Sequence, residues 1–145
     1  MADAVPTTAD MLLVEPVTLL RRTVSLTART MGVARVHEAA SSAQALRLLR
    51  ERAFDGAVIA IEAQHDLALL DEVRTGATAS KPGMPIAVML AECDAMLLAA
   101  LQARGVARVL LKPFKARNLL DTFAMLGKAE PAPAGPQGLY RVAPD

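Results

Sequence analysis

Short apolar runs alternate with stretches of helical periodicity along most of this chain. Runs of strand length occupy residues 11–14, 33–36, 57–61, 86–90 and 108–111. Between these runs apolar residues recur every three or four positions, which is typical of amphipathic helices. Strands that are apolar on both faces and alternate with helices predict a parallel sheet covered on both sides. Right-handed crossovers then give an α/β fold, a doubly wound five-stranded parallel sheet in a three-layer α/β/α sandwich.

Signals for helix ends accompany the periodic stretches. The inward stripe of the first helix consists of Val17, Leu20, Val24, Ala28 and Met31. Gly32 is well placed to stop that helix, and Ser41 with Gln44 three residues later fits a capping box for the second. The other helices are expected from Asp66 to about Arg74, from a cap at Asp94 to before Gly105, and from about Lys115 to Leu126, stopped by Gly127.

These elements place one domain at residues 10–127, after a flexible N-terminus at residues 1–9. Residues 128–145 are rich in Pro, Gly and Ala, which favours a flexible tail. Its residues 139–142, Leu-Tyr-Arg-Val, leave a second interpretation open: a short peptide that docks on a partner or on this domain.

Composition excludes several classes of function. A net charge of +1 and an aromatic content of 3% argue against a nucleic-acid or membrane partner. A single cysteine excludes an internal disulfide and a multi-cysteine metal site. No apolar stretch approaches the roughly 18 residues that a membrane span needs, and the first ten residues do not resemble an export signal. We therefore expect a cytoplasmic protein.

Sites in open parallel sheets form at the carboxyl ends of the strands. The positions expected there are Glu15 and Pro16, Ala60, Leu90, and Lys112. Their separations, the five elements and the motif Lys112-Pro113-Phe114 resemble the receiver domain of bacterial response regulators, over about residues 10–127. The resemblance implies a place in two-component signalling or a phosphorelay.

The resemblance also implies that the chemistry of a receiver is lost. A receiver holds Mg²⁺ with an acidic pair at the positions of Glu15 and Pro16, together with a phosphoacceptor aspartate at the position of Ala60. It places a hydroxyl residue at the position of Leu90 and an aromatic one at that of Val109. We therefore expect an atypical pseudo-receiver that is not an enzyme and has no catalytic residue, metal or cofactor. The sequence leaves open whether its fixed state resembles an active or an inactive receiver.

Lys112 has two interpretations. It could form an ion pair with Glu15, the remaining acid of the pocket. Alternatively, it persists only because Lys-Pro-Phe shapes the loop, through a cis bond before Pro113. His65 follows Glu62 by three residues, but we favour a surface histidine over a metal ligand.

The segment 95–101 is apolar over two turns, so no rotation hides all of it. One interpretation is a deeply packed or alanine-rich helix. The other is a partner-binding patch, with the expected residues Met96, Leu97, Ala100, Arg104, Arg108, Val109 and Lys115.

The preferred function is that of a phosphorylation-independent adaptor, binding a histidine kinase, a phosphotransfer protein or an effector through the first helix or the last two. One alternative is a small-ligand sensor that uses the degenerate phosphorylation pocket for an apolar or anionic metabolite held by Lys112. The other is a homo-oligomerisation module, or homodimer, built on the apolar fourth helix.

Overall fold

The computed structural model describes residues 8–63, 66–128 and 140–142, and only the backbone of the last three. Its elements are β1 (Asp10–Val14), α1 (Thr18–Thr30), β2 (Arg35–Ala39), α2 (Ser42–Glu51), β3 (Gly56–Ala60), α3 (Asp66–Arg74), β4 (Ile86–Leu90), α4 (Ala95–Ala103), β5 (Arg108–Leu111), α5 (Ala116–Lys128) and β6 (Tyr140–Val142). The predictions for His65, for residues 1–7 and for most of the C-terminal tail concern residues outside this description. Within the described part, no helix is long and apolar enough to cross a bilayer.

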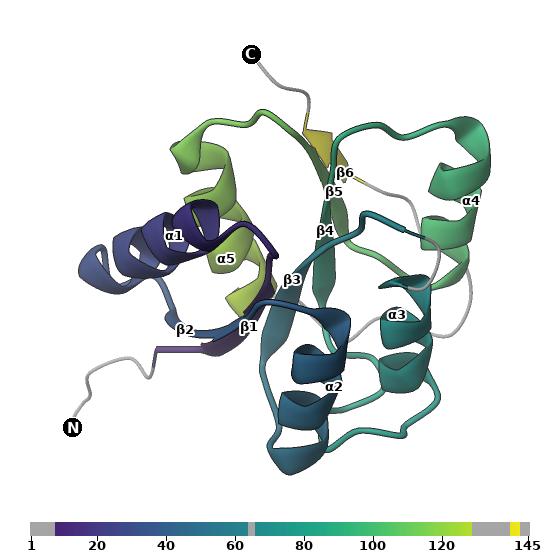
Figure 1. The fold of residues 1–145 in the computed structure, drawn as a ribbon. Helices are drawn as coiled ribbons and strands as arrows, with labels where there is room; N and C mark the ends of the chain where they lie inside the picture. Colours follow the sequence, from purple (N-terminus) through teal and green to yellow (C-terminus); the bar gives the residue numbers. More distant parts are fainter. Residues whose placement is uncertain (1–7, 64–65, 129–139, 143–145) are drawn as a thin grey trace.

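The strands form a parallel sheet in the order β2-β1-β3-β4-β5-β6. Helices α1 and α5 cover one face of this sheet, and α2, α3 and α4 cover the other (Figure 1). The predicted doubly wound, three-layer arrangement of five strands is confirmed. Because the strands are parallel, the segments that follow them gather along one edge of the sheet.

A short sixth strand extends the sheet beyond β5. Residues Tyr140–Val142 pair in parallel with Arg108, Val109 and Leu110. They belong to the region for which we expected a flexible tail, and the alternative interpretation had them docking on this domain. The backbone pairing covers the edge of β5 that would otherwise be open.

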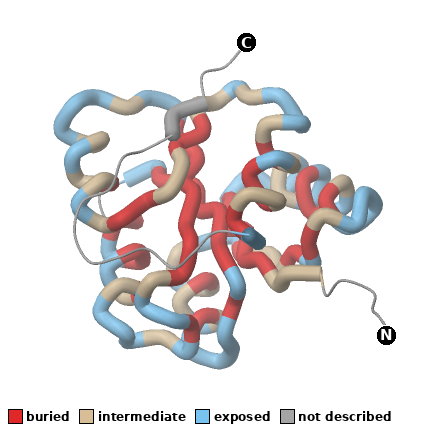
Figure 2. The backbone as a smooth tube through the Cα atoms, turned by 180° about the vertical axis from the view of Figure 1, so that it is seen from behind, coloured by how far each residue is buried: buried red, intermediate tan, exposed pale blue. Residues whose placement is uncertain are grey.

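The core consists of two apolar layers, one on each side of the sheet, separated by strands that are buried at every position of β3 and β4 (Figure 2). Phe123, Leu126 and Ala28 pack on the side of α1 and α5. Leu49, Leu70 and Leu101 pack on the other side. Burying a leucine or phenylalanine side chain contributes about 1.5–3 kcal/mol to stability. These two layers therefore fix the strands whose carboxyl ends carry the candidate site.

Three sequence expectations are wrong in detail. The second strand lies at Arg35–Ala39 and not at residues 33–36, because Val33 still bonds to the end of α1 through the carbonyl of Ala28. Because β2 is an edge strand, it contains polar residues, and its sequence is not the continuous apolar run by which the other strands were predicted. Val17 and Met31 flank α1 and are 52% and 64% exposed, so they do not belong to its inward stripe. Gly127 does not stop the last helix, which ends at Lys128.

The capping predictions are better supported. Ser41 Oγ accepts the amide of Gln44, and Asp94 Oδ1 accepts that of Leu97. Gly32 follows α1 with φ of +69°, a left-handed conformation that favours glycine. Asp66 begins α3, but its carboxylate accepts amides of the preceding loop.

Candidate functional site

The carboxyl ends of four strands bring the predicted site residues to one edge of the sheet. Register places Val14 beside Ile59 and Ala60 beside Met89, so the ends of β1, β3 and β4 are level. The amide of Lys112 donates to the carbonyl of Leu90 at 2.7 Å. The predicted convergence of Glu15, Ala60, Leu90 and Lys112 is therefore confirmed.

An ion pair joins the two remaining charged residues of this edge. Lys112 Nζ lies 2.6 Å from Glu15 Oε1. The side chain of Glu15 is fully buried, whereas that of Lys112 is 24% exposed. The other carboxylate oxygen accepts the amide of Val17 at 2.9 Å. The predicted Glu15–Lys112 pair is confirmed. The peptide bond between Lys112 and Pro113 is cis.

Arg21 extends the pair into a network that sequence reasoning missed. Its Nη1 donates to the backbone carbonyl of Glu15 at 2.9 Å, and its Nε donates to Glu38 Oε1 at 3.1 Å. The arginine side chain is 11% exposed. The position of Arg21 in the helical repeat did not predict this role, because a long side chain on the polar face of a helix can still reach the end of a neighbouring strand. The segment after β1 is thus fixed from two sides.

The residues present do not fit a Mg²⁺ ion of the receiver type. Magnesium takes near-octahedral oxygen ligation, including one or two carboxylates. Here the side chain of Pro16 has no ligand atom and that of Ala60 is a methyl group, so Glu15 is the one acid among the expected positions. Both of its oxygens are already engaged. The described residues contain no group of three or more His, Cys, Asp and Glu side chains that could hold a metal.

Leu90 and Val109 belong to the core. Their exposed fractions are 1% and 0%, and both pack in the layer beneath α3 and α4. Leu90 cannot donate a hydrogen bond at the edge, and the side chain of Val109 has no ring to move. Val109 also cannot contribute to an exposed partner-binding patch in this structure, which corrects that part of the prediction.

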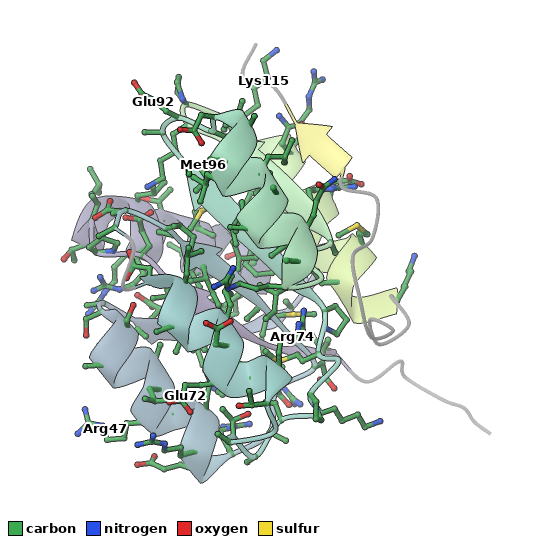
Figure 3. All side chains as sticks on the ribbon, turned by 90° about the vertical axis from the view of Figure 1, so that its right-hand side faces the viewer. Arg47, Glu72, Arg74, Glu92, Met96 and Lys115 are labelled. Atoms are coloured by element: carbon green, nitrogen blue, oxygen red, sulfur yellow. The ribbon has the colours of Figure 1, made fainter. Side chains whose placement is uncertain are left out.

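The other residues of the expected partner-binding patch are accessible to different degrees. Met96 is 82% exposed and Lys115 is exposed, whereas Leu97, Ala100, Arg104 and Arg108 are half-buried. Arg104 pairs with Asp71 at 2.8 Å, and Arg108 pairs with Asp121 at 3.0 Å. Glu92 and Met96 lie at the same end of α4 (Figure 3). The exposed apolar character of this end is therefore concentrated at Met96.

A second exposed apolar surface lies on α1. Leu19 and Leu26 are 78% and 63% exposed. The two are seven positions apart, which places them on one helical face, with the exposed Arg22 between them. The sequence predicted this helix as a possible contact surface but did not single out these residues. The available signal was a leucine outside the inward stripe of the helix.

Comparison with solved structures shows the same architecture. The chemotaxis protein CheY4 of Vibrio cholerae matches with a TM-score of 0.73 and 24% identity, over 83% of this chain and 99% of that one. The fold is that of a receiver domain. A response regulator from Thermotoga maritima gives a TM-score of 0.71 and 20% identity, over 85% of this chain and 100% of that one.

A CheY-like receiver domain protein from Methanospirillum hungatei matches with a TM-score of 0.70 and 19% identity, over 79% of this chain and 90% of that one. No protein-family model matches the chain. No match was found among curated proteins. The likeness to receiver domains therefore concerns the fold.

Proposed function

We propose that this protein is a receiver-like adaptor that acts in two-component signalling by binding a protein partner, without being phosphorylated. The observation that carries the proposal is the Glu15–Lys112 ion pair at an edge where Ala60 ends β3. In a receiver, the corresponding charges serve the metal and the phosphoryl group. Here they neutralise each other.

Among the described residues at the expected site positions, none offers a free oxygen that could accept a phosphoryl group from a donor. Phosphoryl transfer to a carboxylate requires a nucleophilic oxygen and compensation of the charge on the transferring oxygens. Ala60 has no such oxygen, and Glu15 is buried with both oxygens engaged. Loss of acceptor, metal ligands and hydroxyl at one edge favours a module that stays in one state, and we propose that it is not an enzyme.

Partner binding is supported by apolar side chains that a monomer leaves in water. The face of α1 with Leu19 and Leu26, and the end of α4 with Met96, are the two candidate surfaces. Contiguous exposed apolar groups usually mark contact sites. We propose a histidine kinase, a phosphotransfer protein or an effector as the partner, and homodimerisation is the competing use of the same surfaces.

The absence of phosphorylation is tested by amide NMR with a small phosphodonor, Mg²⁺ and beryllofluoride. We expect no saturable shifts around Ala60 and no acyl-phosphate by mass spectrometry. Saturable shifts there, or a phosphorylated carboxylate nearby, overturn the proposal.

The binding role is tested with two surface variants, Leu19→Glu with Leu26→Glu and Met96→Glu with Leu97→Glu. Immobilised wild-type protein should retain a kinase, phosphotransfer protein or effector, and one of the two variants should release it. Ala43→Glu with Ala53→Glu adds the same charge at exposed positions elsewhere and should change nothing. Capture that is insensitive to both surface variants argues against binding through these surfaces. Sedimentation of the free protein distinguishes self-association.

A further inference from the structure

A cleft of about 990 Å³ lies beside the site edge, between α4 and the segments that follow β3 and β4. Residues 61–63 and 91–94 form two of its walls, and one face of α4 forms the third. Leu67, Met89 and Lys112 complete the lining. Sites for small molecules commonly enclose about 300–1,000 Å³, so the cleft has the size of a ligand site.

The wall formed by α4 is apolar and incompletely covered. The helix carries no charged side chain from Ala95 to Ala103, and Leu101 is its one fully buried residue. Met96, Leu97 and Ala100 line the cleft, and Met96 is 82% exposed. A ligand with an apolar body would remove these side chains from water. From Met96 to Arg104 this wall extends about 12 Å along the helix axis, the length of a small molecule.

The two cations of the lining are already neutralised. Lys112 is bound to the buried carboxylate of Glu15 at 2.6 Å. Arg104 is bound to Asp71 at 2.8 Å and also donates to the carbonyl of Ala100. An anionic ligand would therefore have to compete with an existing carboxylate for either of them.

The three acidic side chains of the lining are compensated less completely. Asp94 accepts the amide of Leu97 and caps α4, so the positive end of the helix offsets part of its charge. Glu62 and Glu92 are exposed at the mouth, and neither forms an ion pair with a residue that the structure describes. The mouth of the cleft is therefore negative, while its wall along α4 is apolar.

We propose that this cleft binds a small amphipathic organic cation, an amine whose apolar body packs on Met96, Leu97 and Ala100 and whose ammonium group lies near Glu62 and Glu92. The proposed ligand is positively charged, whereas Lys112 considered alone would favour an anionic ligand in this region. The site is separate from the candidate adaptor surface on α1, whereas it shares Met96 and Leu97 with the candidate surface at the end of α4. A ligand in the cleft would therefore cover part of that second surface.

Three probes with one apolar body test the proposal: 4-phenylbutylammonium, 4-phenylbutanol and 4-phenylbutyrate. Binding is followed through the methyl signals of Met89 and Met96 and through the amides of residues 91–97. We expect saturable shifts with the ammonium ion and a Kd at least about tenfold lower than for the carboxylate at low salt, a preference that screening reduces as salt rises.

Glu62→Gln together with Glu92→Gln should abolish the charge preference and leave the fold intact. Glu51→Gln together with Glu72→Gln removes the same charge outside the cleft and should leave the preference for the ammonium probe unchanged. Glu72 lies toward the opposite end of this face from Glu92 (Figure 3). Ala100→Phe should block all three probes by filling the cleft. Equal binding of the three, tighter binding of the carboxylate, or shifts confined to other regions would overturn the proposal.

Discussion

Lys112 and Glu15 are separated by 97 positions in the sequence, yet Nζ and Oε1 lie 2.6 Å apart. The pair joins the end of β5 to the end of β1 across two intervening strands. Its two members differ in burial, because the carboxylate is fully buried and the lysine is 24% exposed. The consequence of losing each partner should therefore differ.

Lys112→Met should destabilise the protein more than Glu15→Gln does. Removing the lysine leaves a buried carboxylate without its counterion, and we expect a loss of about 2–4 kcal/mol, reduced from a fully buried pair by the exposure of the lysine. Glutamine at position 15 can still accept hydrogen bonds, and the lysine can turn to water, so the loss should stay below about 2 kcal/mol.

Urea unfolding measures both values, and Lys81→Met provides a control at an exposed lysine. An equal or larger loss for Glu15→Gln would contradict the asymmetry.

The sequence predicted this pair because parallel strands bring their carboxyl ends together, a rule that needs no side-chain detail. It also predicted β3 and β4 well, since strands buried on both faces read as continuous apolar runs. It misplaced β2, whose edge position admits His37 and Glu38. It did not predict the roles of Arg21 and Arg74. The oxygens that accept their hydrogen bonds lie in distant segments, which only the complete fold brings close to the arginines.

Arg74 should be a main determinant of the order of the loop before β4. Its guanidinium donates to the carbonyls of Pro82, Met84, Arg104 and Gly105 at 2.8, 2.7, 2.7 and 3.3 Å. Burial lowers the pKa of Arg74. Arg74→Met leaves these carbonyls without their donor, and we expect a loss of about 2–4 kcal/mol.

Amide hydrogen exchange should accelerate at Gly83, at Met84 and at residues 104–106 in this variant. Arg74→Lys should recover little of the stability, since an ammonium group lacks the planar fork. Arg50→Met, at an exposed position on α2, is the matched control. Unchanged exchange in both segments would exclude the role.

Asp10 should make stability depend on pH in the acidic range. Hydrogen bonds from Arg35 at 3.0 and 2.9 Å are the largest cause that lowers the pKa of Asp10. Burial opposes them as the second-largest cause, and the contact with His37 Nε2 at 3.1 Å lowers the pKa further. Because the pKa of Asp10 is lower in the folded state, the ionised carboxylate stabilises the fold at pH values above its ordinary pKa of 3.8. This stabilisation disappears as the pH falls through the lowered pKa of the folded state.

The stability difference between wild type and Asp10→Asn should therefore be present at pH 7 and shrink below about pH 4. Salt should reduce it, because the cluster is partly open to solvent. A difference that stays constant from pH 7 to pH 2 in thermal or urea unfolding would show that the charge of Asp10 contributes nothing.

Introducing two acids at the ends of β1 and β3 should convert this edge into a metal site. In the variant with Pro16→Asp and Ala60→Asp, three carboxylates including Glu15 would converge where β1 and β3 end, which is a ligand set that Mg²⁺ accepts. Without metal, their mutual repulsion should lower Tm relative to wild type. Added MgCl₂ should then raise Tm, because an ion that binds only the folded state stabilises it. Wild-type protein should show no such rise at matched ionic strength, and Ala60→Asp alone should show a smaller one. A Mg²⁺-dependent rise in the wild type would mean that Glu15 is available to metal in spite of Lys112, and it would contradict the proposal that the two charges only neutralise each other.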